Sequence, residues 1–181
     1  MTPHPLYYLA PLTLLLAGCT IFGLPVADPA LAQRPADFAL VYQWREGSLP
    51  PPYHYEYDIE LQPSGLGEIR MRPDYPADGV PLWIESFSLS DSQLDSLYQV
   101  FVTQGALTTE WNTQDDPPVG GSSDRLRLTA HGRTIEIPSF VVSEQAAAAN
   151  TITSAVQAIV PPDIWQQLNT RREEYVTAHG G

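Results

Sequence analysis

The chain contains no lysine, and all nine of its basic residues are arginine. Because it has 21 acidic residues, its formal net charge is −12. Nucleic-acid binding draws on clustered Lys and Arg that neutralise phosphates, so we expect no nucleic-acid partner. Docking on anionic lipid through a polybasic segment is excluded on the same ground. The missing lysine also excludes Schiff-base chemistry and lysine-anchored pyridoxal phosphate.

Cysteine is almost as scarce, because Cys19 is the only one in 181 residues. A single thiol makes no internal disulfide and no zinc site of the usual thiolate kind. The fold must therefore be held by a hydrophobic core. A domain of roughly 150 residues buries about 68–70 % of the surface that its unfolded chain exposes. A composition of 43 % hydrophobic and 17 % charged residues is typical of an ordered globular protein.

The N-terminal segment lacks Asp, Glu, Lys and Arg from Met1 to Gly18. Its apolar run, Leu6 to Ala17, is too short to span a bilayer as a helix and has the length of a signal-peptide core. The run ends in Leu16-Ala17-Gly18-Cys19, which resembles the lipobox of bacterial lipoproteins. That resemblance implies that residues 1–18 are a signal peptide, that cleavage falls before Cys19, and that Cys19 is lipidated and anchors the protein to a membrane.

A second cleavage site stays open. Ala30-Leu31-Ala32 precedes Gln33 in the A-x-A pattern of ordinary signal peptidase sites, so residues 1–32 are the alternative signal peptide. The protein would then be soluble, in the periplasm or secreted. With the lipid anchor, residues 19–37 form a proline-containing, semi-extended tether at the periplasmic face of a membrane. Thr20 follows the cysteine, and by resemblance to the lipoprotein sorting rule this favours the outer membrane.

Residues 38–181 are expected to form a single α+β domain. The hydrophobic periodicity predicts a mainly antiparallel sheet of hairpins, one central helix and a C-terminal helical pair. Ser90 and Gln93 form a capping box at the start of the central helix, and Gly105 ends it. The predicted strands are 38–44, 53–61, 68–72, 82–89, 107–112, 125–130 and 133–138, and the predicted helices are 90–105, 143–160 and 163–176.

The clearest strand pattern is "YHYEYDIEL", residues 53–61, in which aromatic and aliphatic residues alternate with polar ones. In a hairpin with 68–72, we expect Leu61 opposite Ile69 and Ile59 opposite Met71. The polar face would then place carboxylates opposite arginines. Its expected members are His54, Glu56, Asp58 and Glu60, with Arg70 and Arg72 across the strand pair.

This polar face is one candidate metal site, since neighbouring side chains on it could converge on a hard cation. Facing arginines disfavour a metal and favour a solvated strand face. The loop from Asp115 to Asp124 offers carboxylates and glycines for calcium but lacks the ligand spacing of an EF-hand. We therefore predict no metal site and no cofactor.

No catalytic residue is predicted either. The sequence contains no G-x-S-x-G elbow, no H-E-x-x-H and no phosphate-binding loop. Its histidines after the signal, His54, His131 and His179, have no base or nucleophile beside them in sequence. The alternating Tyr53, Tyr55 and Tyr57, with the tryptophans, form either a core face or a stacking platform for sugar or peptide.

These observations favour an exported envelope lipoprotein with a non-catalytic binding or accessory role, and an envelope protein or glycan as its partner. Two alternatives remain from the sequence. One is an envelope hydrolase whose site is assembled from residues distant in the chain. The other is a soluble secreted inhibitor or ligand carrier.

Overall fold

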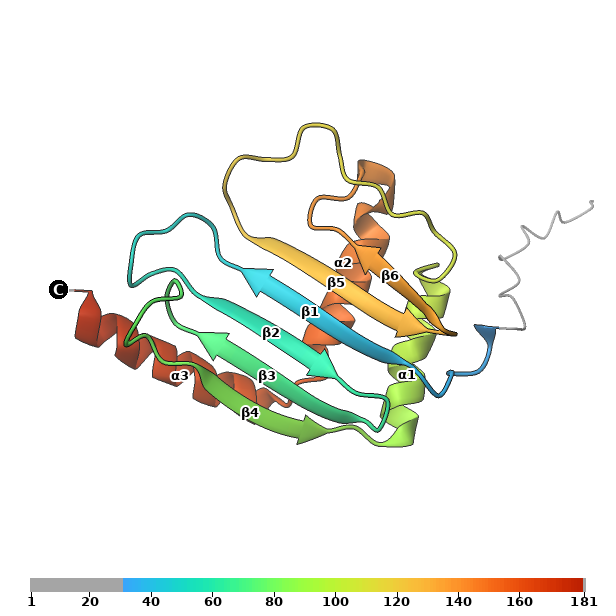
Figure 1. The fold of residues 1–181 in the computed structure, drawn as a ribbon, viewed down its shortest axis with the longest axis horizontal. Coiled ribbons are helices and arrows are strands. Elements are labelled where there is room, and N and C mark those ends of the chain that lie inside the picture. Colours follow the sequence, from blue (N-terminus) through green and yellow to red (C-terminus); the bar gives the residue numbers. More distant parts are fainter. Residues whose placement is uncertain (1–30, 181) are drawn as a thin grey trace, which may run out of the picture.

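Six antiparallel strands form one sheet in the order β4-β3-β2-β1-β5-β6, and three helices lie against one of its faces (Figure 1). The structure is a computed structural model that describes residues 31–180. The strands are β1 (Ala39–Arg45), β2 (Glu56–Leu61), β3 (Leu66–Arg72), β4 (Trp83–Ser88), β5 (Ser123–Ala130) and β6 (Arg133–Ile137). The helices are α1 (Asp91–Thr103), α2 (Ser143–Ala158) and α3 (Pro162–His179).

The predicted fold class is confirmed. An antiparallel sheet, one helix between strands and two helices at the C-terminal end make an α+β domain. The short strand predicted over residues 107–112 is wrong, because that segment forms turns and irregular structure. Its nearest ladder contact is an isolated bridge between Thr113 and Val141.

Helix α1 begins and ends where its sequence signals place it. The Ser90 side chain accepts from the Gln93 N–H, and the Gln93 side chain accepts from the Ser90 N–H at 2.9 Å. At the other end, Gly105 has a φ of +70°, which favours glycine. The Ala106 N–H reaches back to the Phe101 carbonyl at 2.8 Å, so the helix closes with a Schellman-type arrangement.

The predicted β2–β3 hairpin forms, but its register is wrong by two residues. Ile59 lies opposite Ile69, and Tyr57 lies opposite Met71. The parity is right, so the apolar residues still share one face. The register differs because the turn spans residues 62–65, where the Gly65 N–H donates to the Gln62 carbonyl at 2.9 Å and Gly65 has a φ of +85°.

A packing contact between β3 and β4 accompanies this register. Gly67 faces the core opposite Leu61, and the ring of Phe87 on β4 lies over it. A Cβ atom at Gly67 would lie 2.3 Å from a ring carbon of Phe87. The glycine is therefore required by an aromatic ring twenty residues further along the chain.

The alternation predicted for residues 53–61 fails at its start. Tyr53 is 45 % exposed and His54 only 4 % exposed, the reverse of the expected order. The cause is a turn before the strand, where the Tyr53 N–H donates to the Pro50 carbonyl at 2.9 Å. Strand geometry, and with it the period of two, begins only at Glu56.

The core fills the space between the sheet and the helices. Each central strand contributes alternate residues, and each helix contributes one stripe. The largest fully buried side chains are Tyr42, Tyr98, Phe38, Phe101, Ile59, Leu61, Ile69, Met71, Leu94, Leu126, Leu128 and Ile137. Burial of this apolar surface is the main stabilising contribution to the fold.

Contacts with the domain begin before the predicted boundary at Phe38. Leu31 packs against the core, and the Ala32 carbonyl accepts from Gln99 Nε2 on α1 at 3.0 Å. Arg34 pairs with Asp91 at 3.0 Å and Asp95 at 2.7 Å, both on α1. Cys19, the predicted signal peptide and most of the predicted tether lie outside the described residues. Within residues 31–180, no helix has both the length and the apolar character needed to cross a membrane.

Candidate functional site

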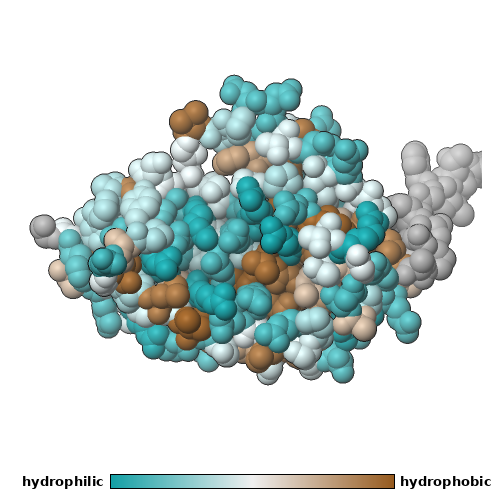
Figure 2. Space-filling view, in the orientation of Figure 1, coloured by the Kyte–Doolittle hydropathy of each residue, from teal (hydrophilic) through white to brown (hydrophobic). Residues whose placement is uncertain are grey.

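The open face of the sheet carries the carboxylates that the sequence presented as a possible metal site. Glu56 pairs with Arg45 at 2.9 Å and Arg72 at 2.7 Å, and Asp58 pairs with Arg45 at 2.9 Å. Glu60 lies 3.5 Å from Arg70. Figure 2 shows that this face is predominantly hydrophilic. Arginines thus occupy the positions between the carboxylates, and the ion pairs hold neighbouring strands in register.

The acidic loop before β5 projects from the molecule at the top of Figure 1. Asp115 and Asp116 are exposed, and Val119 is fully exposed. Within residues 31–180, no group of three or more His, Cys, Asp or Glu side chains is arranged to hold a metal ion.

The three histidines lie in different parts of the fold. His131 occupies the β5–β6 turn with a φ of +54°, where the Asp37 carboxylate accepts from its N–H at 2.9 Å and its Nε2 lies 2.8 Å from the Tyr98 hydroxyl. His179 Nδ1 contacts the Tyr175 carbonyl one turn earlier in α3. The contacts of His131 stabilise the β5–β6 turn, and the contact of His179 lies at the C-terminal end of α3. The Gly132 and His131 N–H groups also lower the pKa of Asp37.

His54 is buried and lies flat on Tyr75, with ring centroids 3.8 Å apart. Its Nδ1 is 3.3 Å from the Gly47 carbonyl, and its Nε2 has no hydrogen-bond partner among the described residues. The pair borders a hollow of about 300 Å³ that Glu46 and Phe140 also line. This hollow is shallow, and the imidazole nitrogen that lacks a partner is itself enclosed.

The aromatic residues gather on the helix-covered face. Trp44 stacks on Tyr57 with centroids 5.2 Å apart, and Trp165 meets the edge of Tyr57 at 5.0 Å. Tyr57 is buried, while Tyr55 is half-buried beneath the Arg172 guanidinium, 3.9 Å from its ring centre. The core-face interpretation therefore holds for Tyr57, and Tyr53 stands apart from this cluster on the surface.

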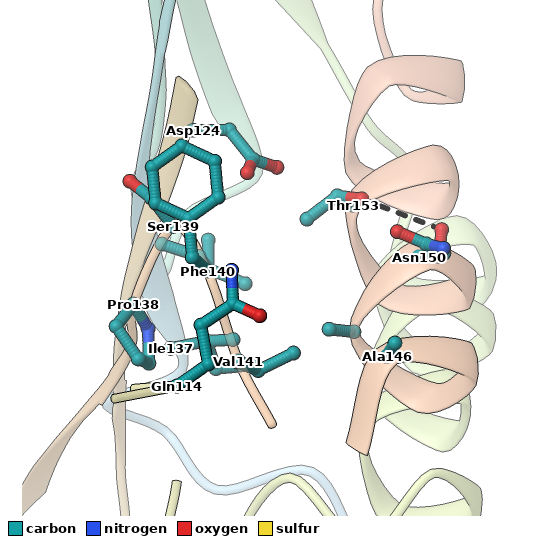
Figure 3. Close-up of a pocket in the computed structure, with 12 residues that line it drawn as sticks. Gln114, Asp124, Ile137, Pro138, Ser139, Phe140, Val141, Ala146, Asn150 and Thr153 are labelled. Carbon is teal, nitrogen blue, oxygen red and sulfur yellow. Dashed lines mark hydrogen bonds between the residues drawn. The ribbon is translucent and has the colours of Figure 1, made fainter. Parts of the chain in front are cut away.

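A cleft opens beside this aromatic cluster, between the strands β5 and β6 and helix α2. It has a volume of about 180 Å³. Figure 3 shows Asp124 and Gln114 on the strand side and Thr153 and Asn150 on the helix side, with the cleft between them. The residues that line it are Gln114, Asp124, Leu126, Ile137, Pro138, Ser139, Phe140, Val141, Ala146, Ala149, Asn150 and Thr153.

A hydrogen-bonded network fixes the carboxylate of this cleft. The Tyr42 hydroxyl donates to Asp124 Oδ2 at 3.2 Å. Gln157 Nε2 on α2 donates to the hydroxyls of Tyr42 at 3.0 Å and Tyr57 at 2.9 Å. The backbone carbonyl of Gln157 accepts from Trp165 Nε1 at 3.2 Å. Strands β1, β2 and β5 and helices α2 and α3 are thereby tied together around one acidic group.

The network also sets the protonation of its members. Burial raises the pKa of Asp124, and the hydrogen bond from Tyr42 offsets part of this rise. Burial raises the pKa of Tyr57 to about 12. Burial is also the main cause that raises the pKa of Tyr42, and charge on Tyr57 and Asp124 at the pH where Tyr42 ionises raises it further. Both phenols therefore stay protonated at neutral pH. Asp124 is the one carboxyl group among the described residues that line the cleft.

The sequence interpretation missed this site. Asp124 was counted as the end of the acidic loop, whereas it lies inside β5. One signal was present: Asp124 continues the two-residue alternation of Leu126, Leu128 and Ala130, and so falls on the core side of the strand. Nothing in the sequence indicates that Gln157, 33 residues later, reaches the same network.

No family model and no curated protein matches this chain.

Proposed function

We propose that the protein is an exported lipoprotein of a bacterial envelope that binds a partner non-catalytically through the cleft at Asp124. The proposed location rests on the resemblance of Leu16-Ala17-Gly18-Cys19 to a lipobox. The proposed binding role rests on the preorganised network around the cleft. A pocket with an apolar lining and a few fixed polar groups is the usual form of a ligand site.

One observation carries the binding role. Asp124 is held by Tyr42 beside a cleft, and burial raises its pKa. A carboxylate in that environment costs stability in the free protein, because burial disfavours its charged form. A ligand that supplies hydrogen-bond donors or positive charge would offset this cost, and a cost of this kind is typical of functional sites.

The anchor is tested by the intact mass of the mature protein isolated from its native envelope. We expect a chain that begins at Cys19 and carries acyl groups. A mass equal to the unmodified chain from Gln33 would overturn the lipid anchor and establish the soluble alternative. Extraction of the protein into detergent but not into high salt would agree with the acylated form.

The binding role is tested by capture from an envelope extract. The bait is the chain from residue 19 onward with Cys19→Ser, which removes the lipid and keeps the contacts made by residues 31–37. We expect a protein or glycan that is enriched on this bait and lost with Asp124→Asn. An exposed carboxylate on the opposite face provides the matched control, Glu136→Gln, which should retain the partner. Equal enrichment on both variants would contradict the proposed site.

A further inference from the structure

The cleft at Asp124 has a definite polarity. Leu126, Ile137 and Ala149 form an apolar floor of buried side chains. One carboxylate, that of Asp124, stands at its end. The remaining polar groups are uncharged amides and hydroxyls: Gln114, Ser139, Asn150 and Thr153.

Within residues 31–180, Asp124 has no ion-pair partner. No arginine or histidine is among the side chains that line the cleft in the described part of the chain. The groups that face Asp124 from β1, β2 and α2 are the phenols of Tyr42 and Tyr57 and the amide of Gln157. Among the arginines of the strands, Arg45, Arg70 and Arg72 pair with carboxylates on the opposite face.

The ligand that fits this polarity is a cation with an apolar stem. An anionic group would meet Asp124 without a compensating charge, and the net charge of −12 opposes its approach. A wholly apolar group would cover the partly buried carboxylate and leave it unpaired. The cleft volume of about 180 Å³ is close to the roughly 150 Å³ of a cavity that takes benzene, so the cleft has room for one side chain.

The hydrogen bonds favour an ammonium group over a guanidinium. Asp124 Oδ2 already accepts from Tyr42, so a planar guanidinium that took both carboxylate oxygens would have to share Oδ2 with that phenol. An ammonium group needs one carboxylate oxygen and has two further donors. The oxygens of Gln114, Ser139 and Thr153 around the cleft can accept them.

We propose that the Asp124 cleft binds a primary ammonium group on an unbranched alkyl chain, as carried by a lysine side chain or a free alkylamine. The alkyl stem lies on Leu126 and Ile137, and the ammonium pairs with Asp124. The inference rests on the binding role proposed above and gives its chemistry. The chain contains no lysine of its own, so the ligand comes from another molecule.

The test is a titration followed by backbone amide shifts in the chain from residue 19 onward with Cys19→Ser. The probe is N-acetyl-lysine methylamide, and its matched neutral probe is the 6-hydroxynorleucine analogue, in which a hydroxyl replaces the ammonium. We expect saturable shifts at Ile137 and Thr153 with the lysine probe. The neutral probe should bind about tenfold more weakly or worse, because a hydrogen-bonded charge pair is lost.

Two variants test whether binding of the lysine probe depends on Asp124. Asp124→Asn should weaken binding of the lysine probe about tenfold or more. Glu144→Gln, which removes an exposed carboxylate from the same helix that lines the cleft, should leave the affinity unchanged within about twofold. Equal binding of the two probes, or unchanged binding by the Asp124 variant, would overturn the proposal. Tighter binding of N-acetyl-arginine methylamide would overturn the choice of ammonium.

Free diamine distinguishes the two sources of the ligand. Cadaverine binding as tightly as the lysine probe would assign the cleft to free alkylamines, and much weaker cadaverine binding would assign it to lysine within a polypeptide. The inference can fail while the proposed function stands: the amine probes would not bind, but the envelope partner would still be lost with Asp124→Asn. The reverse result, amine binding with no enriched partner, would contradict the binding role in the envelope.

Discussion

Carboxylates in two regions of the sheet have different partners. On the open face, Glu56 and Asp58 each have an arginine within 2.9 Å. On the helix-covered face, Asp124 accepts from the Tyr42 hydroxyl at 3.2 Å, and that hydroxyl accepts in turn from the Gln157 amide. The first arrangement neutralises charge within the protein. The second places a partly buried carboxyl group beside a cleft, without an arginine or histidine among the described residues that line it.

This difference shows that a cluster of acidic residues in the sequence does not by itself indicate a metal or ligand site. The polar strand pattern around residues 56–60 drew attention because several carboxylates lie close together, yet its arginines satisfy them. Exposed ion pairs contribute little to stability, about 0–1 kcal/mol each, and serve mainly to fix register. A single acidic residue on the apolar face of a strand is the more informative feature, since burial there has a cost.

The largest expected difference between the faces is in packing. Ile59→Ala removes a fully buried side chain from the centre of the sheet and should lower the free energy of unfolding by about 2–5 kcal/mol. Ile84→Ala makes the same change on the open face, where Ile84 is 49 % exposed, and should change it by less than about 0.5 kcal/mol. Urea unfolding followed by circular dichroism measures both. Similar losses would mean that the open face is covered in solution.

A second prediction tests the register of β3 and β4 on the covered face. Gly67→Ala places a methyl group against the Phe87 ring and should lower the free energy of unfolding by about 1–3 kcal/mol. Adding Phe87→Leu should recover part of that loss, because a smaller side chain leaves room for the methyl group. Thermal melts of the two single variants and the double variant give the coupling. Strictly additive losses would contradict the observed pairing of β3 and β4.

The smallest expected change in stability comes from removing one carboxylate charge, and its sign should differ between Asp124 and Asp58. Asp124→Asn should raise the melting temperature at neutral pH, because it removes a partly buried carboxyl group whose charged form is disfavoured by desolvation, and it keeps a partner for Tyr42. Asp58→Asn, which breaks a pair with Arg45, should lower the free energy of unfolding by less than about 1 kcal/mol. Melts at neutral pH compare the two variants directly. A lower melting temperature for Asp124→Asn would show that the carboxylate stabilises the free protein.

The pH dependence of stability, compared between the wild type and Asp124→Asn, tests the same effect. Because the pKa of Asp124 is raised in the folded protein, the folded state holds more protons than the unfolded state between the two pKa values. This contribution to stability is therefore fully present below the unfolded pKa and is lost as pH rises through the folded pKa. The difference in stability between Asp124→Asn and wild type should grow over that range and then level off.

Local signals predicted most of the fold. The capping box at Ser90 and the glycine at position 105 define α1, and the apolar alternation of residues 126–137 defines the β5–β6 hairpin. The predictions that were wrong concern features set by distant contacts or by the geometry of a turn. The β2–β3 register is accompanied by a ring from β4 over Gly67, and a turn at residues 50–53 reverses His54 and Tyr53.

The site was harder to predict than the fold. Its network joins β1, β2, β5 and α2, and Tyr42 and Gln157 are 115 residues apart. Hydrophobic periodicity identifies each element but not which polar atoms meet between them. Only the inward position of Asp124 was visible in the sequence, and an acidic loop immediately before it concealed that position.

Photo-crosslinking in the intact envelope tests the central claim most directly, that the covered face and not the open face meets the partner. A photoreactive phenylalanine analogue replaces Asn150, an exposed residue at the cleft, or Glu136, an exposed residue on the open face. We expect a crosslinked product from position 150 that disappears with Asp124→Asn, and none from position 136. A product from position 136 alone would contradict the account.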